Sequence, residues 1–270
     1  MNKKCLAYPY VVWMIGFMVL PLLMVAYYGL TDKNGSFTLE NLAEISINYN
    51  FKSLMLALGL SLLSTLICLL LAYPLAMILK KKSLNQHSFI ILLFILPMWM
   101  NFLLRTLAWQ TLLERNGVIN NILKLLGLPK LRIINTPYAI ILGMVYNFLP
   151  FMVLPIYNVI VKIDQNVINA GKDLGASNFQ VFTKIILPLS VPGIISGITM
   201  VFIPALTTFV ISDLLGGGKI LLIGNVIEQE FTQAGNWHAG SGLSLVLMLF
   251  ILLSMAILAK YDKNGEGTAL

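Results

Sequence analysis

The sequence predicts an all-α fold: a polytopic membrane helix bundle with six transmembrane helices. Three observations predict it. Hydrophobic residues make up 58% of the chain and charged residues only 11%, against about 25% charged in an ordinary soluble domain. Six stretches are long and apolar enough to cross a membrane as helices, and basic residues gather beside their ends.

The six apolar stretches each reach the roughly 20 residues that a helix needs to cross a hydrocarbon core of about 30 Å. Arg105 in the third is their one charged residue. They cover residues 5–31, 53–79, 88–113, 133–161, 185–212 and 239–259. We expect a transmembrane domain over residues 51–260. Residues 1–50 would supply a cytoplasmic tip, the first transmembrane helix and the first outer loop, and residues 261–270 a short cytoplasmic tail.

The first stretch follows Lys3 and Lys4, as the apolar region of a signal peptide would. It is longer than the roughly 7–15 apolar residues of such a region and has no small-x-small cleavage site. We therefore expect it to be retained as the first transmembrane helix.

The charges predict an orientation. With the N-terminus inside, the inner segments carry ten basic and four acidic residues, and the outer segments seven of each. Cytoplasmic loops are enriched in Lys and Arg, so we expect both termini in the cytoplasm, although the basic outer segment 115–132 argues the other way. The net charge of +7 does not indicate nucleic acid, because the basic residues flank spans instead of forming one face.

No catalytic or metal site is expected. The glycine run before Lys219 lacks the first glycine and the Ser or Thr of a Walker A loop. His87 and His238 fall in loops on opposite predicted sides of the membrane, and the two cysteines are far apart. We expect no enzymatic activity and no cofactor bound by this chain.

The fifth span contains Gly193 and Gly197 in a G-x-x-x-G spacing. Small residues at this spacing allow two membrane helices to approach closely. The motif is short, so it predicts close packing only weakly.

The loop between the fourth and fifth spans has the pattern of two short helices. Asp164 is a predicted N-cap, and Gly175 a predicted left-handed C-cap residue. Ser177 and Gln180 form a predicted capping box that opens a second helix toward the fifth span.

The first of these helices has a small apolar face, formed by Val167, Ala170, Gly171 and Leu174. Such a face suits docking into a groove on another protein. The alternative is that it packs against the helices of its own chain.

The same loop resembles a known signature. The run Asn169-Ala170-Gly171, followed by Gly175 and then by Ile185-Ile186-Leu187-Pro188, is similar to the E-A-A-x3-G-x9-I-x-L-P signature of bacterial ABC importer permeases. Asn169 replaces the family's glutamate and Gly171 its second alanine, whereas the small-residue surface and Gly175 are retained. Residues 96–110, 115–120 and 209–217 resemble the spermidine/putrescine branch of that family.

The resemblance implies a type I ABC importer (MetI-like) permease fold in a bacterial inner membrane. It also implies a second homologous permease, an ATPase dimer that uses ATP and Mg²⁺, and an extracytoplasmic polyamine-binding protein as partners. The residues that it assigns to coupling with the ATPase are Asp164, Asn169, Ala170, Gly171, Asp173, Gly175 and Ser177.

A polyamine path would use carboxylates and aromatic faces. The outer-side candidates are Asp213, Glu228 and Glu230 with Trp99, Trp109 and Trp237. The tryptophans could equally anchor helices at headgroup level, and Arg105 could be the counter-ion of Asp213 in a structural ion pair.

Two alternative functions stay open at this level. One is a related ABC importer for another small solute, such as an organophosphonate or an iron chelate. The other is a channel or an ion-driven secondary transporter, against which the docking loop argues.

Overall fold

A computed structural model describes residues 8–81 and 96–261 of the chain. Apart from one isolated bridge between Thr31 and Phe37, the regular structure of this part is helical. The first half comprises α1 (Tyr8–Met14), the π-helical turn η2 (Ile15–Val19), α2 (Leu20–Leu30), α3 (Glu40–Ala43), η3 (Glu44–Ser46), α4 (Asn48–Lys81), η4 (Leu96–Trp99), α6 (Phe102–Leu113) and α7 (Val118–Leu125). The second half comprises α8 (Pro137–Lys162), α9 (Gln165–Asp173), α10 (Asn178–Val181), the π-helical turn η5 (Phe182–Ile186), α11 (Leu187–Thr207), α12 (Val210–Gly216), α13 (Ile223–Thr232) and α14 (Trp237–Tyr261).

Five helices in the described part are long and apolar enough to span a membrane. They are Tyr10–Leu30, Asn48–Lys80, Pro137–Lys162, Asn178–Thr207 and Trp237–Leu258, and each overlaps a predicted span. The remaining predicted span, 88–113, begins outside the described residues. The all-α membrane bundle expected from the sequence is confirmed.

Two predicted spans differ from the structure. In the described part of span 88–113, the helix is interrupted between η4 and α6. Asn101 is the N-cap of α6, and its side-chain oxygen accepts hydrogen bonds from the Leu103 and Leu104 amides. The sequence predicts one helix over span 185–212. The helix in the structure runs from Asn178 to Thr207, and the next residue, Thr208, has an extended backbone with φ −66° and ψ 139°.

The core lies where α4, α8 and α11 pack against one another. The G-x-x-x-G prediction for α11 is confirmed by its contact with α8. A Cβ on Gly193 would lie 2.9 Å from the Pro155 carbonyl oxygen, and one on Gly197 would lie 2.7 Å from the Met152 sulfur. Only glycine allows these two helices to come so close.

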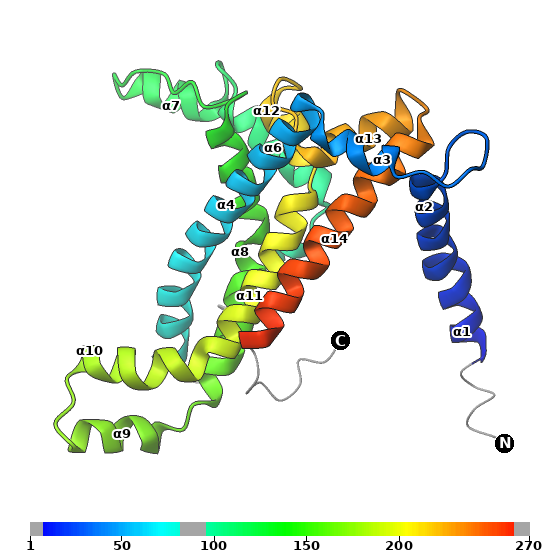
Figure 1. The fold of residues 1–270 in the computed structure, drawn as a ribbon. Coiled ribbons are helices and arrows are strands. Elements are labelled where there is room, and N and C mark those ends of the chain that lie inside the picture. Colours follow the sequence, from blue (N-terminus) through cyan, green and yellow to red (C-terminus); the bar gives the residue numbers. More distant parts are fainter. Residues whose placement is uncertain (1–7, 82–95, 262–270) are drawn as a thin grey trace.

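The two ends of the bundle differ (Figure 1). At one end lie α9 and α10, the start of α1 and the finish of α14. At the other end lie α3, α7, α12 and α13. The loop after α8 and both ends of the described chain therefore share one side, as the predicted topology requires. That this side faces the cytoplasm stays a prediction from charge.

Candidate functional site

The helix α9 begins where the sequence predicts. Asp164 is its N-cap, and a carboxylate oxygen accepts a hydrogen bond from the Asn166 amide at 2.9 Å. This bond satisfies one of the amides that a helix N-terminus leaves free.

The same helix ends in a Schellman motif centred on Gly175. This residue has φ +84°, in the left-handed region that glycine enters without steric cost. Its amide donates to the Lys172 carbonyl at 2.8 Å, and the Ala176 amide donates to the Gly171 carbonyl at 3.1 Å. The predicted C-cap role of Gly175 is confirmed.

Ser177 opens the second helix of the loop. Its hydroxyl accepts from the Gln180 amide at 3.3 Å, and the Gln180 side chain accepts from the Ser177 amide at 2.9 Å. This is the predicted capping box. Because α10 continues through η5 into α11, the loop is joined to a core helix without a flexible connection.

One side of α9 packs on its own chain. Ile168, which is 6% exposed, lies with Val181 and Ile186 in a small apolar cluster. Gly171 faces Ile185, whose terminal methyl would lie 2.5 Å from an added Cβ. The prediction that Gly171 belongs to one face with Val167, Ala170 and Leu174 is therefore corrected, since Gly171 points inward and Ile168 is the missed anchor.

The other side of α9 is an exposed apolar surface. Leu174 is 89% exposed and Val167 46%, and Ala170 is exposed between them. We call these three residues the α9 outer face. Exposed apolar residues grouped on a surface outside the membrane spans are a feature of contact sites for other proteins. The packing of α9 against its own chain is therefore observed, and the docking of its outer face stays a prediction.

The polar residues of this loop also lie on its surface. Asn169 and Asp173 are exposed, and the Asn169 side-chain oxygen accepts from Gln165 at 3.2 Å, one helical turn earlier. The Asn169 side chain is thus hydrogen-bonded within its own helix. It is neutral, whereas the glutamate of the family signature would be charged.

At the opposite end, Asn225 holds together the break between α11 and α12. Its amide group donates to the Phe209 carbonyl at 3.1 Å and to the Asp213 carboxylate at 2.6 Å, and its oxygen accepts from the Leu222 amide at 3.0 Å. Asn225 is fully buried. These bonds join Phe209 and Asp213, at the start of α12, to the start of α13.

The structure brings two predicted carboxylates, Asp213 and Glu228, near each other. Partial burial of its carboxyl raises the pKa of Asp213, the negative charge of Glu228 raises it further, and the bond from Asn225 opposes both. A cation placed between the two carboxylates would relieve this repulsion.

Glu230 lies near an acidic residue that the sequence did not single out. Burial raises the pKa of Glu44, and the charge of Glu230 adds to that rise. Glu44 lies in η3, far from α13 along the chain, so spacing could not have paired them.

Arg105 is not the counter-ion of Asp213. It is 7% exposed, and its guanidinium donates to the Pro97 carbonyl at 2.8 Å. It also lies 6.0 Å from the Phe102 ring centroid and 5.9 Å from that of Tyr146. The ion-pair interpretation is wrong for the described residues, because Arg105 braces the broken third span instead.

The three predicted tryptophans are spread over different surfaces. Trp109 stacks edge-on against Tyr146 of α8 with 5.1 Å between ring centroids, and Trp99 is 77% exposed in η4. Neither the contact of Trp109 nor the position of Trp99 joins these two tryptophans to the carboxylates of Asp213, Glu228 and Glu230.

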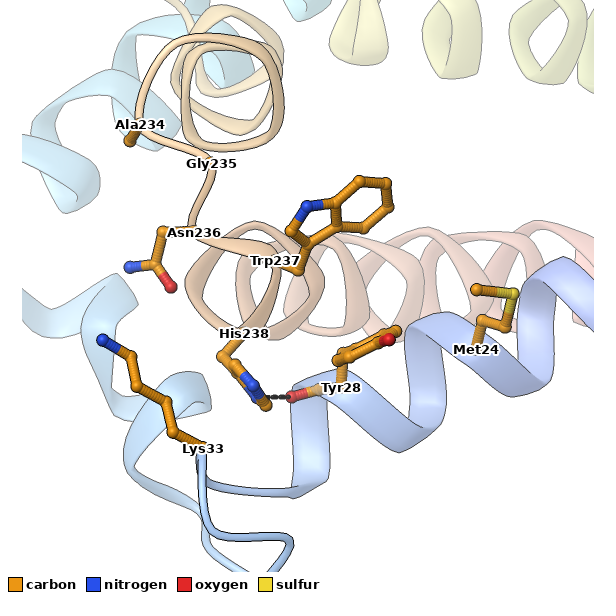
Figure 2. Close-up of a pocket in the computed structure, with 8 residues that line it drawn as sticks. All are labelled: Met24, Tyr28, Lys33, Ala234, Gly235, Asn236, Trp237 and His238. Carbon is orange, nitrogen blue, oxygen red and sulfur yellow. Dashed lines mark hydrogen bonds between the residues drawn. The ribbon is translucent and has the colours of Figure 1, made fainter.

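Trp237 lines a cavity of about 590 Å³ between α2 and the start of α14. Figure 2 shows Lys33, Tyr28 and His238 around the same space. The His238 ring nitrogen Nδ1 lies 2.6 Å from the Thr31 carbonyl and 3.0 Å from that of Tyr28, so it ties the end of α2 to α14. Lys33 belongs to the same lining, and its positive charge would repel a polyamine there.

Comparison with known proteins agrees with this architecture. Residues 6–263 match the family model described as binding-protein-dependent transport system inner membrane component. The chain is 38% identical over 260 residues to the spermidine/putrescine transport system permease protein PotB of Haemophilus influenzae, covering 93% of this chain and 90% of that protein. It is also 38% identical to PotB of Escherichia coli, covering 91% and 92%.

A solved structure has the same fold. It is described as a bacterial ABC transporter involved in the import of the acidic polysaccharide alginate. The match has a TM-score of 0.80 at 18% identity and covers 98% of this chain and 96% of that one. The family match over residues 6–263 and the 38% identity to PotB show that this chain belongs to the family of binding-protein-dependent transport system inner membrane components.

Proposed function

We propose that this chain is a permease subunit of an ATP-driven importer for polyamines of the spermidine and putrescine class. The observation that carries the substrate class is the 38% identity, over nine-tenths of the chain, to proteins named as spermidine/putrescine permeases. The capped loop around α9, with its exposed outer face, supports coupling to a separate ATPase.

In this proposal the chain forms half of a pathway, and a second homologous permease (PotC-like) forms the other half. A PotA-like ATPase dimer, using ATP and Mg²⁺, contacts the α9 outer face, and a PotD-like binding protein delivers polyamine to the end that carries α12 and α13. Both termini lie in the cytoplasm, and this chain holds no cofactor of its own.

The test is uptake by the complete complex in proteoliposomes. We expect labelled spermidine and putrescine to accumulate only when the loaded binding protein is outside and ATP is inside. Accumulation without ATP would indicate a channel or a secondary transporter. An ATP-dependent complex that ignores both amines would belong to an importer for another small solute.

Asp213→Asn should lower polyamine uptake by about tenfold or more. Removing a carboxylate that bonds an ammonium group costs about 1.5–3 kcal/mol, while the substituted amide can still pair with Asn225. Uptake would be measured beside Glu114→Gln, which neutralises an exposed acid directly after α6, in the loop that leads to α7 at the same end. Co-purification of the partner subunits checks assembly, and uptake kinetics equal to those of the control would remove Asp213 from the path.

A further inference from the structure

A groove of about 520 Å³ separates the end of α11 from α13 and α14. It is distinct from the cavity of Figure 2. Its wall combines a carboxylate with aromatic and aliphatic side chains, and none of the lining residues in the described part of the chain is basic. The lining used below is Thr207, Phe209, Glu228, Phe231, Leu247 and Ile251.

Glu228 supplies the negative charge of this groove. Its side chain is half-buried, and its Oε1 accepts a hydrogen bond from the Thr232 hydroxyl at 2.9 Å. A carboxylate can accept several hydrogen bonds, so it can still accept from an ammonium group in the groove. Asp213 lies near enough to interact electrostatically with Glu228.

The broken helix adds a second favourable element for a cation. α11 ends at Thr207, and the C-terminal end of a helix carries a partial negative charge. The backbone of α13 packs against this end, because a Cβ on Gly224 would lie 2.7 Å from the Thr207 carbonyl oxygen and 2.9 Å from that of Thr208. A cation in the groove would therefore lie in the field of the helix end without bonding these two oxygens. In secondary transporters, interrupted helices present such ends to coupling ions.

The rest of the groove suits a methylene chain. The rings of Phe209 and Phe231 line it beside Glu228, and Leu247 and Ile251 line it along α14. Aromatic faces attract ammonium groups, and aliphatic walls bury CH₂ groups at a gain of about 0.8 kcal/mol each. From Ser244 to Leu252, the lining residues of α14 cover about 12 Å at 1.5 Å per residue, which fits an extended chain and not a compact ion.

We propose that this groove is a binding site for an extended aliphatic polyamine, with one ammonium group on Glu228, near the carbonyl end of α11, and the methylene chain along Leu247 and Ile251. The inference rests on the proposed function. It adds to that function the assignment of substrate contact to one groove of this chain, separate from the cavity beside Trp237.

Substrate protection of an introduced thiol tests the site in the purified complete complex. Thr232→Cys would place a thiol in the lining. Thr111→Cys is the matched control, because both threonines are exposed and both hydroxyls donate to the carbonyl four residues earlier. Maleimide labelling would be timed with and without spermidine, in the nucleotide-free and the ATP-bound complex, with labelling of the parent chain subtracted.

We expect spermidine to slow labelling at position 232 by about fivefold or more in at least one state, and not at position 111. 1,8-Octanediol, a chain of similar length without charge, should not protect. Adding Glu228→Gln to Thr232→Cys should abolish protection by spermidine.

Equal labelling with and without spermidine in both states would overturn the inference. Equal protection by the diol would also overturn it, because it would show that the groove binds any aliphatic chain. Protection that survives Glu228→Gln would also overturn it. Because ATP-dependent spermidine uptake is measured separately, loss of the groove assignment with uptake intact leaves the proposed function standing. Absence of uptake in the parent complex removes the function itself.

Discussion

Leu174→Asp should detach the ATPase from this chain while the membrane bundle stays assembled. Leu174 is 89% exposed at the end of α9, on the face that the proposal places against the ATPase. Its apolar side chain would be buried in the contact, and an unpaired carboxylate in its place would cost several kcal/mol. The ATPase recovered with a tagged chain should fall by about tenfold or more, and ATP-driven uptake should fall with it.

Leu125→Asp is the matched control for this change. Leu125 is 86% exposed on α7, at the other end of the molecule, so the same substitution there introduces the same charge without reaching the ATPase. Recovery of the second permease should be unaffected in both variants. If Leu174→Asp retained as much ATPase as Leu125→Asp, the α9 outer face would not be the contact.

Gly175→Val should uncouple ATP hydrolysis from uptake. Gly175 has φ +84°, and a Cβ there would meet no atom within 4 Å, so the cost is in the backbone. A left-handed conformation costs an L-residue about 1–2 kcal/mol, and a β-branched side chain is least compatible with it. Relief of that strain would change the angle between α9 and the helix that continues into α11, which the Schellman motif now fixes.

We expect uptake by the Gly175→Val complex to fall by about tenfold while ATP hydrolysis continues. Gly127→Val is the control, because Gly127 ends α7 with φ +71°, open space around a Cβ and the same pair of backbone hydrogen bonds. The separate substitution Gly175→Asn should leave most of the uptake intact, since asparagine tolerates the left-handed region. Normal uptake per ATP in the valine variant would contradict the coupling role of Gly175.

The features of the loop that could be predicted from the sequence are local ones. Asp164, Gly175 and Ser177 interact with backbone groups within a few residues, so residue type and spacing are sufficient to predict their capping roles. The direction that each side of α9 faces depends on Ile185 and Ile186 in the following helix, which is why the sequence missed Ile168.

The broken helix and the groove could not be predicted in the same way. Hydropathy is continuous through Thr208, and the side chain that stabilises the break belongs to Asn225, on another element. The pairing of Glu44 with Glu230 and the approach of Glu228 to Asp213 likewise depend on how α12 and α13 fold over the end of the bundle. A pattern along the chain does not specify such tertiary contacts.

Purification of the tagged chain from its native membrane tests the central claim most directly. The account predicts that an ATPase and a second permease co-purify with the chain of unchanged sequence, and that in a second preparation a crosslinking residue introduced in place of Leu174 joins this chain to the ATPase. A chain that purifies intact with no ATPase, under conditions that preserve its transport activity, would contradict the account.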